Sequence, residues 1–206
     1  MESERTNLLS DIRYIRGIME LSSAHRLLPD WAAIVGGALV LVSTALTWRL
    51  TGSADAKEVL FLPPMQKLLA AGLWLGTAAV SVFLYWYLAS KEATRLGVSL
   101  EARPTQLARQ AMGPAILAAG VLTLRLVSDR HYGFIPGAWI LLYGIGLYNA
   151  GLFSTEEPRL LGLLFIVTGI VAILVLPGID LWLAALSFGG YHIAFGTYAL
   201  YKKRAR

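Results

Sequence analysis

The stretch LLGLLFIVTGIVAILVLPGI, residues 160–179, decides the class of this chain. It holds no charged side chain over twenty positions. An α-helix rises about 1.5 Å per residue, so twenty residues cross a hydrocarbon core of about 30 Å. The sequence therefore predicts an integral membrane protein.

Six long apolar runs fill most of the chain, and each predicts a transmembrane helix. The third is the shortest, because only residues 110–124 separate Arg109 from Arg125, whose long side chains can reach the headgroups. We therefore expect an all-α bundle of six helices. These helices are expected at 31–49, 66–89, 107–127, 132–154, 159–177 and 180–201.

The composition leaves little mass outside the membrane. Of 206 residues, 56% are hydrophobic and 15% are charged, whereas a soluble domain carries about 25% charged residues. We expect one transmembrane domain, residues 31–201, between an N-terminal segment, 1–30, and a basic tail, 202–206. The net charge of +5 is typical of cytoplasmic loops that meet lipid phosphates, and we expect no nucleic-acid partner.

The distribution of Lys and Arg predicts the orientation. Thirteen of these residues fall on the side of the two termini and five on the other side. Because cytoplasmic loops are enriched in Lys and Arg, we expect both termini in the cytoplasm of a bacterial inner membrane. The tail can anchor the last helix or contact lipid headgroups, through Lys202, Lys203, Arg204 and Arg206.

Residues 7–22 predict an amphipathic helix ahead of the first span. Leu8, Ile12, Ile15 and Met19 recur at helical spacing and form one apolar stripe. Such a helix lies on the inner leaflet, under the bundle, or against a cytoplasmic protein partner.

Small residues recur at spacings that bring helices together. In lipid, such residues let two backbones approach closely, as in a GxxxG pair. They favour a compact bundle and, equally, a homo-oligomer. The glycines concerned are Gly72, Gly76, Gly113, Gly120, Gly144, Gly146, Gly151, Gly189, Gly190 and Gly196.

His192 is an ionisable residue near the middle of the last expected span, in the sequence FGGYHIAFG. Intramembrane ionisable groups are candidates for function. A hydrogen bond inside the bundle, a ligand or proton site, and a haem ligand are the three interpretations, in that order. His25 and His131 are expected at opposite membrane faces, so we expect no metal site and no cofactor.

Polar side chains on the second, fourth and sixth expected helices could line a cavity around His192. Interhelical hydrogen bonds would satisfy the same groups without a cavity. Thr77, Ser81 and Tyr143 belong to this group. The residues that we expect to bind a ligand are His192, Tyr191, Tyr198, Ser187, Tyr148, Asn149 and Tyr85.

Three segments resemble an uncharacterised group of small bacterial membrane proteins: YIRGIME at 14–20, PGAWILLYG at 136–144, and FGGYHIAFG at 188–196. The resemblance implies a six-helix protein without a defined activity, and it hints at sensing or regulation.

No catalytic motif such as HExxH, GxSxG or a P-loop occurs in the chain. We therefore expect no catalytic residues and a non-enzymatic accessory or sensory membrane subunit. The alternative is a carrier of small molecules or lipids, with a pocket between the second, fourth and sixth helices. An inverted repeat of the first three and last three helices would fit such a carrier.

Overall fold

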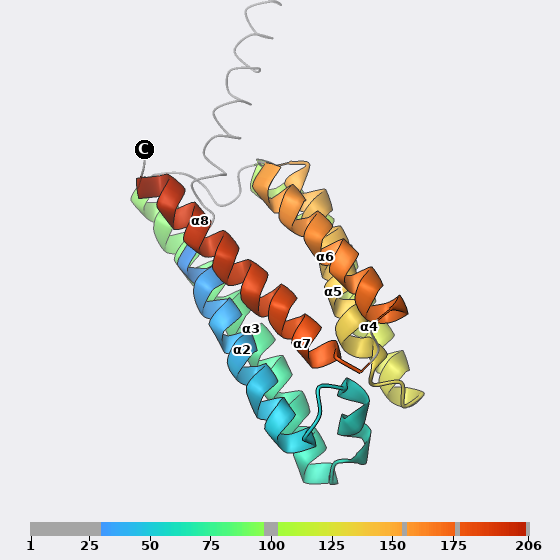
Figure 1. Ribbon diagram of the computed structural model, residues 1–206. Helices are drawn as coiled ribbons and strands as arrows, with labels where there is room; N and C mark the ends of the chain where they lie inside the picture. Colours follow the sequence, from blue (N-terminus) through green and yellow to red (C-terminus); the bar gives the residue numbers. More distant parts are fainter. Residues whose placement is uncertain (1–29, 97–102, 154–155, 176–177, 205–206) are drawn as a thin grey trace, which may run out of the picture.

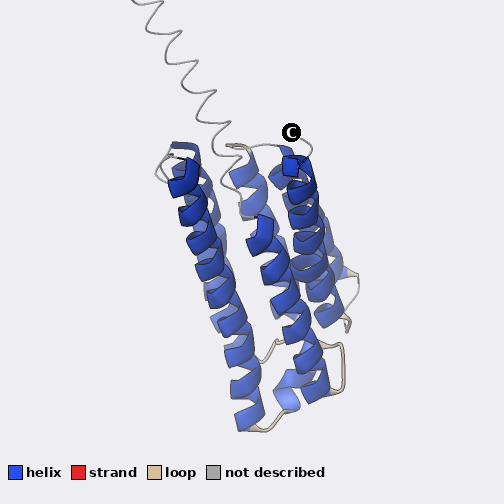
Figure 2. Ribbon diagram, turned by 90° about the vertical axis from the view of Figure 1, so that its left-hand side faces the viewer, coloured by secondary structure: helices blue, strands red, loops and turns tan. Residues whose placement is uncertain are grey.

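The computed structural model describes residues 30–96, 103–153, 156–175 and 178–204. The expected amphipathic helix 7–22 and Arg206 lie outside the described residues. Within them, all regular structure is helical and there is no strand. Figure 2 shows the helices side by side, joined by loops at their ends.

The helices follow the expected apolar runs, but two are longer than the runs. Helix α3 continues to Leu96 rather than residue 89, and α4 begins at Arg103 rather than 107. Their ends carry charged side chains, which a hydropathy pattern excludes from a span although they are compatible with a helix. The described elements are α2 (Asp30–Thr51), η1 (Ala56–Phe61), α3 (Pro64–Leu96), α4 (Arg103–Ser128), α5 (Phe134–Gly151), α6 (Glu156–Leu174), α7 (Asp180–Ala184), η2 (Ala185–Tyr191) and α8 (His192–Arg204).

Four of these helices are long and apolar enough to cross a membrane. They are α2, Pro64–Arg95 of α3, Thr105–Ser128 of α4, and α6. Helix α5 has 18 residues and includes Pro136 and Asn149, which lower its hydropathy. The last expected span is one continuous helical segment, in which the π-helix η2 lies between α7 and α8, so neither α-helix is long enough by itself to cross a membrane.

The helices form two groups, with α2, α3 and α8 in one and α4, α5 and α6 in the other (Figure 1). Helix α2 packs against α3, η2 and α8, and α5 packs against α4 and α6. The first group therefore combines the two ends of the described chain, and the second group contains its middle. Pairing α2, α3 and α4 in turn with α5, α6 and the α7–α8 segment would exchange the two groups, so the arrangement is compatible with an inverted repeat, which stays a prediction.

Helices α5 and α6 meet along a glycine seam, which we define as Gly137, Gly144, Gly151, Gly162 and Gly169. These glycines recur seven residues apart on each helix. A Cβ atom added at Gly144 would lie 2.7 Å from the backbone nitrogen of Ile166, and one added at Gly169 would lie 2.5 Å from that of Leu141. The backbones are therefore as close as glycine alone permits.

Helices α2 and α3 meet through polar side chains. The Ser43 and Thr77 hydroxyls share a hydrogen bond of 2.6 Å, and the Trp74 indole N–H donates to the Thr47 hydroxyl at 3.0 Å. Thr47 itself donates to the Ser43 carbonyl at 2.8 Å. We call these four side chains the hydroxyl seam.

Candidate functional site at the junction of the two groups

The two groups meet where α7 and η2 pack against α5 and α6. A π-helix is rare and often marks a functional position, because it changes the direction of the side chains that follow. Here it contains Gly189 and Gly190 and ends just before His192. A Cβ atom at Gly189 would lie 2.6 Å from a methyl group of Leu41, so this segment also lies close against α2.

His192 is bound to the other group of helices. Its Nε2 atom lies 2.8 Å from the Tyr143 hydroxyl on α5. Its Nδ1 atom is buried and has no hydrogen-bond partner among the described residues. Whether Tyr143 or His192 donates depends on which ring nitrogen of His192 carries the proton.

Tyr191 makes the second hydrogen bond across the junction. Its hydroxyl lies 2.9 Å from that of Thr168 on α6, which also donates to the Leu164 carbonyl at 2.8 Å. The adjacent residues Tyr191 and His192 therefore connect the last helical segment to both α6 and α5.

Aromatic rings surround these hydrogen bonds. Phe165 is fully buried, and its ring centroid lies 5.0 Å from that of Tyr143 and 5.2 Å from that of Phe188. The rings of Tyr191 and His192 lie 5.5 and 5.4 Å from Phe165. Their tilted and edge-to-face arrangements are the favourable ones for aromatic pairs, so the junction is a packed core.

The structure divides the expected ligand-binding residues among several places. His192 and Tyr191 meet at the junction, and Ser187 lies beside them, fully buried, donating to the Leu183 carbonyl at 2.7 Å. Tyr198 is half exposed, and the Lys202 ammonium lies over its ring, 5.9 Å from the ring centroid. Tyr85 is half exposed on α3.

The other two expected residues lie near the end of α5. The Arg159 guanidinium sits 5.2 Å from the ring centroid of Tyr148. Asn149 lines a hollow of about 550 Å³ between α4 and α5, away from the junction. The proposed cavity therefore does not gather these seven residues around one space.

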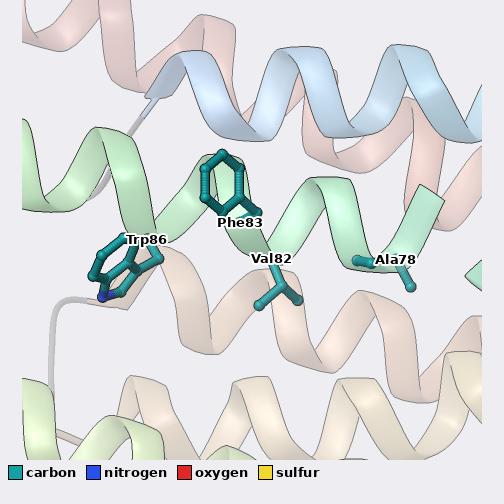
Figure 3. A pocket seen from close by; sticks show the side chains of 5 residues that line it. Ala78, Val82, Phe83 and Trp86 are labelled. Carbon is teal, nitrogen blue, oxygen red and sulfur yellow. The ribbon is translucent and has the colours of Figure 1, made fainter. Parts of the chain in front are cut away.

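A second hollow, also of about 550 Å³, is lined by residues of α3 alone (Figure 3). Ala78, Val82, Phe83 and Trp86 lie along one side of the helix there. Among the described residues, no other helix contributes side chains to its lining, so this part of the chain offers a ligand no opposing wall.

Sequence reasoning missed Thr168 and the two carboxylates Glu157 and Asp30. Thr168 is the one polar side chain in residues 160–179, and this isolation could have singled it out. Lys202 forms an ion pair with Glu157 of α6, and Lys203 pairs with the buried Asp30 of α2 at 2.6 Å. Two of the expected headgroup residues therefore contact carboxylates of the bundle, while Arg204 is exposed.

Comparison with protein families, curated proteins and solved structures finds no match to this chain. The resemblance to small bacterial membrane proteins thus stays an expectation. Among the described residues, no group of three or more His, Cys, Asp or Glu could hold a metal ion. The junction offers hydrogen bonds and ring contacts between the two groups of helices.

Proposed function

We propose that this chain is a non-enzymatic accessory or sensory subunit of a bacterial inner membrane, with six membrane-crossing segments and both termini in the cytoplasm. One observation carries the proposal: a single helical segment, residues 180–204, connects the two groups both in the core and at the end of the bundle. It contacts them through His192 and Tyr191 in the core and through Lys202 at the end.

This arrangement suits the transmission of a conformational change from the core of the bundle to its end, rather than catalysis. A movement of α5 or α6 in the core would displace His192 or Tyr191, and the same helix carries the basic residues Lys202, Lys203 and Arg204. A change in the membrane core would thus reach the face where a partner is expected. In this proposal, the partner contacts residues 7–22 and the basic tail.

The relay can be tested because the chain has no cysteine. Glu157→Cys with Lys202→Cys would place two thiols where the ion pair now lies, and the rate of disulfide formation in membranes would report the geometry at that end. We expect Tyr143→Phe, which removes the hydrogen bond to His192 in the core, to change this rate severalfold. The control is Thr197→Val, because Thr197 is exposed and its hydroxyl bonds only to the Ile193 carbonyl of its own helix. Equal rates of disulfide formation in the double-cysteine protein and in its Tyr143→Phe and Thr197→Val variants would contradict the relay.

The accessory role has its own test. Removal of residues 1–22 should leave the bundle folded, as judged by thermal stability in mild detergent, and should abolish co-purification with a stoichiometric protein partner. Retention of that partner by the shortened chain would contradict the proposal. A membrane protein recovered with a bound small molecule, and with no protein partner, would favour the carrier instead.

A further inference from the structure

We propose that the hollow between α4 and α5 binds a single phospholipid whose headgroup donates hydrogen bonds, such as phosphatidylethanolamine or phosphatidylglycerol. The hollow measures about 550 Å³. Residues that line it include Gln110, Ala111, Pro114, Leu142, Ile145 and Asn149. This site is distinct from the junction at His192 and does not rest on the proposed relay.

Two amide side chains face this hollow without a partner. Gln110 and Asn149 are both exposed, and the described part of the chain offers neither side chain a hydrogen-bond partner. In a bilayer, an amide that finds no protein partner must bond to water or to lipid. Gln110 belongs to α4 and Asn149 to α5.

Pro114, which also lines the hollow, leaves a third polar group without a partner in its own helix. It lies inside α4 and has no backbone N–H, so the carbonyl of Gln110, four residues earlier, lacks its usual intrahelical donor. A freed carbonyl is an acceptor and calls for a hydrogen-bond donor from outside the helix.

The position of these groups fits a headgroup better than an acyl chain. Asn149 lies in the last turn of α5, which ends at Gly151, so it is at the end of the bundle. Leu142 and Ile145 continue the lining toward the middle of the helix, and Leu152 and Phe153 line the hollow beyond Asn149. A lipid bound here would have polar partners at its head and apolar partners along its chains.

The chemistry of the three groups selects the headgroup. The amide N–H groups can donate to phosphate or ester oxygens, which every phospholipid has. The backbone carbonyl of Gln110 and the side-chain amide oxygens of Gln110 and Asn149 need hydrogen-bond donors. An ethanolamine ammonium or a glycerol hydroxyl supplies a donor, and a choline does not.

Lipid retention tests the proposal directly. The full chain would be reconstituted in nanodiscs containing equal amounts of phosphatidylethanolamine and phosphatidylcholine, extracted in mild detergent, and examined by native mass spectrometry. We expect one retained phosphatidylethanolamine in preference to phosphatidylcholine. With a net hydrogen bond of about 1 kcal/mol, the preference should be at least about fivefold.

Three variants locate the site. Asn149→Leu and Gln110→Leu should each reduce retention of phosphatidylethanolamine, while the matched control Gln106→Leu, an exposed residue one turn earlier on α4 that does not line the hollow, should not. Pro114→Ala restores the N–H without adding bulk and should reduce the preference for the donor headgroup. Equal retention of both lipids, or equal retention by Gln110→Leu and Gln106→Leu proteins, would overturn the proposal.

Discussion

The glycine seam between α5 and α6 and the hydroxyl seam between α2 and α3 join neighbouring helices in different ways. At the glycine seam, backbones touch, and the carbonyl of Gly162 would lie only 3.0 Å from a Cβ atom at Gly144. At the hydroxyl seam, the side chains of Ser43, Thr77, Thr47 and Trp74 make the contact through hydrogen bonds. In lipid there is no hydrophobic force between helices, so close packing and interhelical hydrogen bonds are the two available sources of association.

The two seams differ in how well they tolerate amino-acid substitutions. A seam of touching backbones has no side chain that can move aside, whereas a hydrogen-bonded seam can lose one bond and keep the others. We therefore expect substitutions at the glycine seam to have the larger effects.

Gly162→Ala should have the largest effect. A Cβ atom at Gly162 would collide with the backbone of Tyr148, so α5 and α6 must separate. The expected loss is about 3 kcal/mol in the free energy of unfolding, as for an overpacked core, measured by denaturation of the reconstituted protein. The control is Gly76→Ala on α3, where an added Cβ would meet nothing within 4 Å. Equal destabilisation by both would show that the loss does not come from the seam.

Thr47→Val should have an intermediate effect. It removes the acceptor of the Trp74 indole N–H and a bond to the Ser43 carbonyl. We expect a loss of about 1–2 kcal/mol in the free energy of unfolding. Thr44→Val is the matched comparison, since the Thr44 hydroxyl is buried and has no hydrogen-bond partner among the residues that the structure describes. That variant should be neutral or more stable, and a loss equal to that of Thr47→Val would contradict this account of the hydroxyl seam.

Glu157→Gln should have the smallest effect. It removes the ion pair with Lys202, which joins the two groups at the end of the bundle with both side chains partly exposed. Such pairs contribute about 0.2–1 kcal/mol and are screened by salt. The difference in melting temperature between variant and wild type should therefore shrink as the salt concentration rises. A difference that is large and independent of salt would place the ion pair among the structural contacts of the core.

The helical class and the approximate positions of the helices were predictable from the sequence. Long uncharged runs permit only helices in lipid, because every backbone group must find its partner inside the segment. The prediction that the helix after residue 66 ends at 89 was wrong, since α3 continues to Leu96. Charged residues such as Lys91 and Glu92 end a hydropathy run but do not end a helix.

The candidate site was predictable only in part. His192 and Tyr191 were singled out as polar residues in an apolar run, and the structure pairs them with Tyr143 and Thr168. The π-helix that precedes them was not predictable, because the residues of η2 show no pattern that distinguishes it from an α-helix. The glycines of α3 show that a sequence motif can also predict a contact that does not form. Gly72 and Gly76 match the GxxxG motif for helix contact, yet within the described chain they contact no other helix.

The sequence by itself determined that this chain is helical, that its helices are long and apolar enough for a membrane, and which polar residues interrupt them. Each of these properties depends on neighbours along the chain, and local composition and periodicity report them directly. Tertiary structure decided which helices became partners. The grouping of α8 with α2, the use of one glycine pair and not another, and the separation of Asn149 from His192 depend on how surfaces fit between segments distant in sequence, and no local pattern contains that fit.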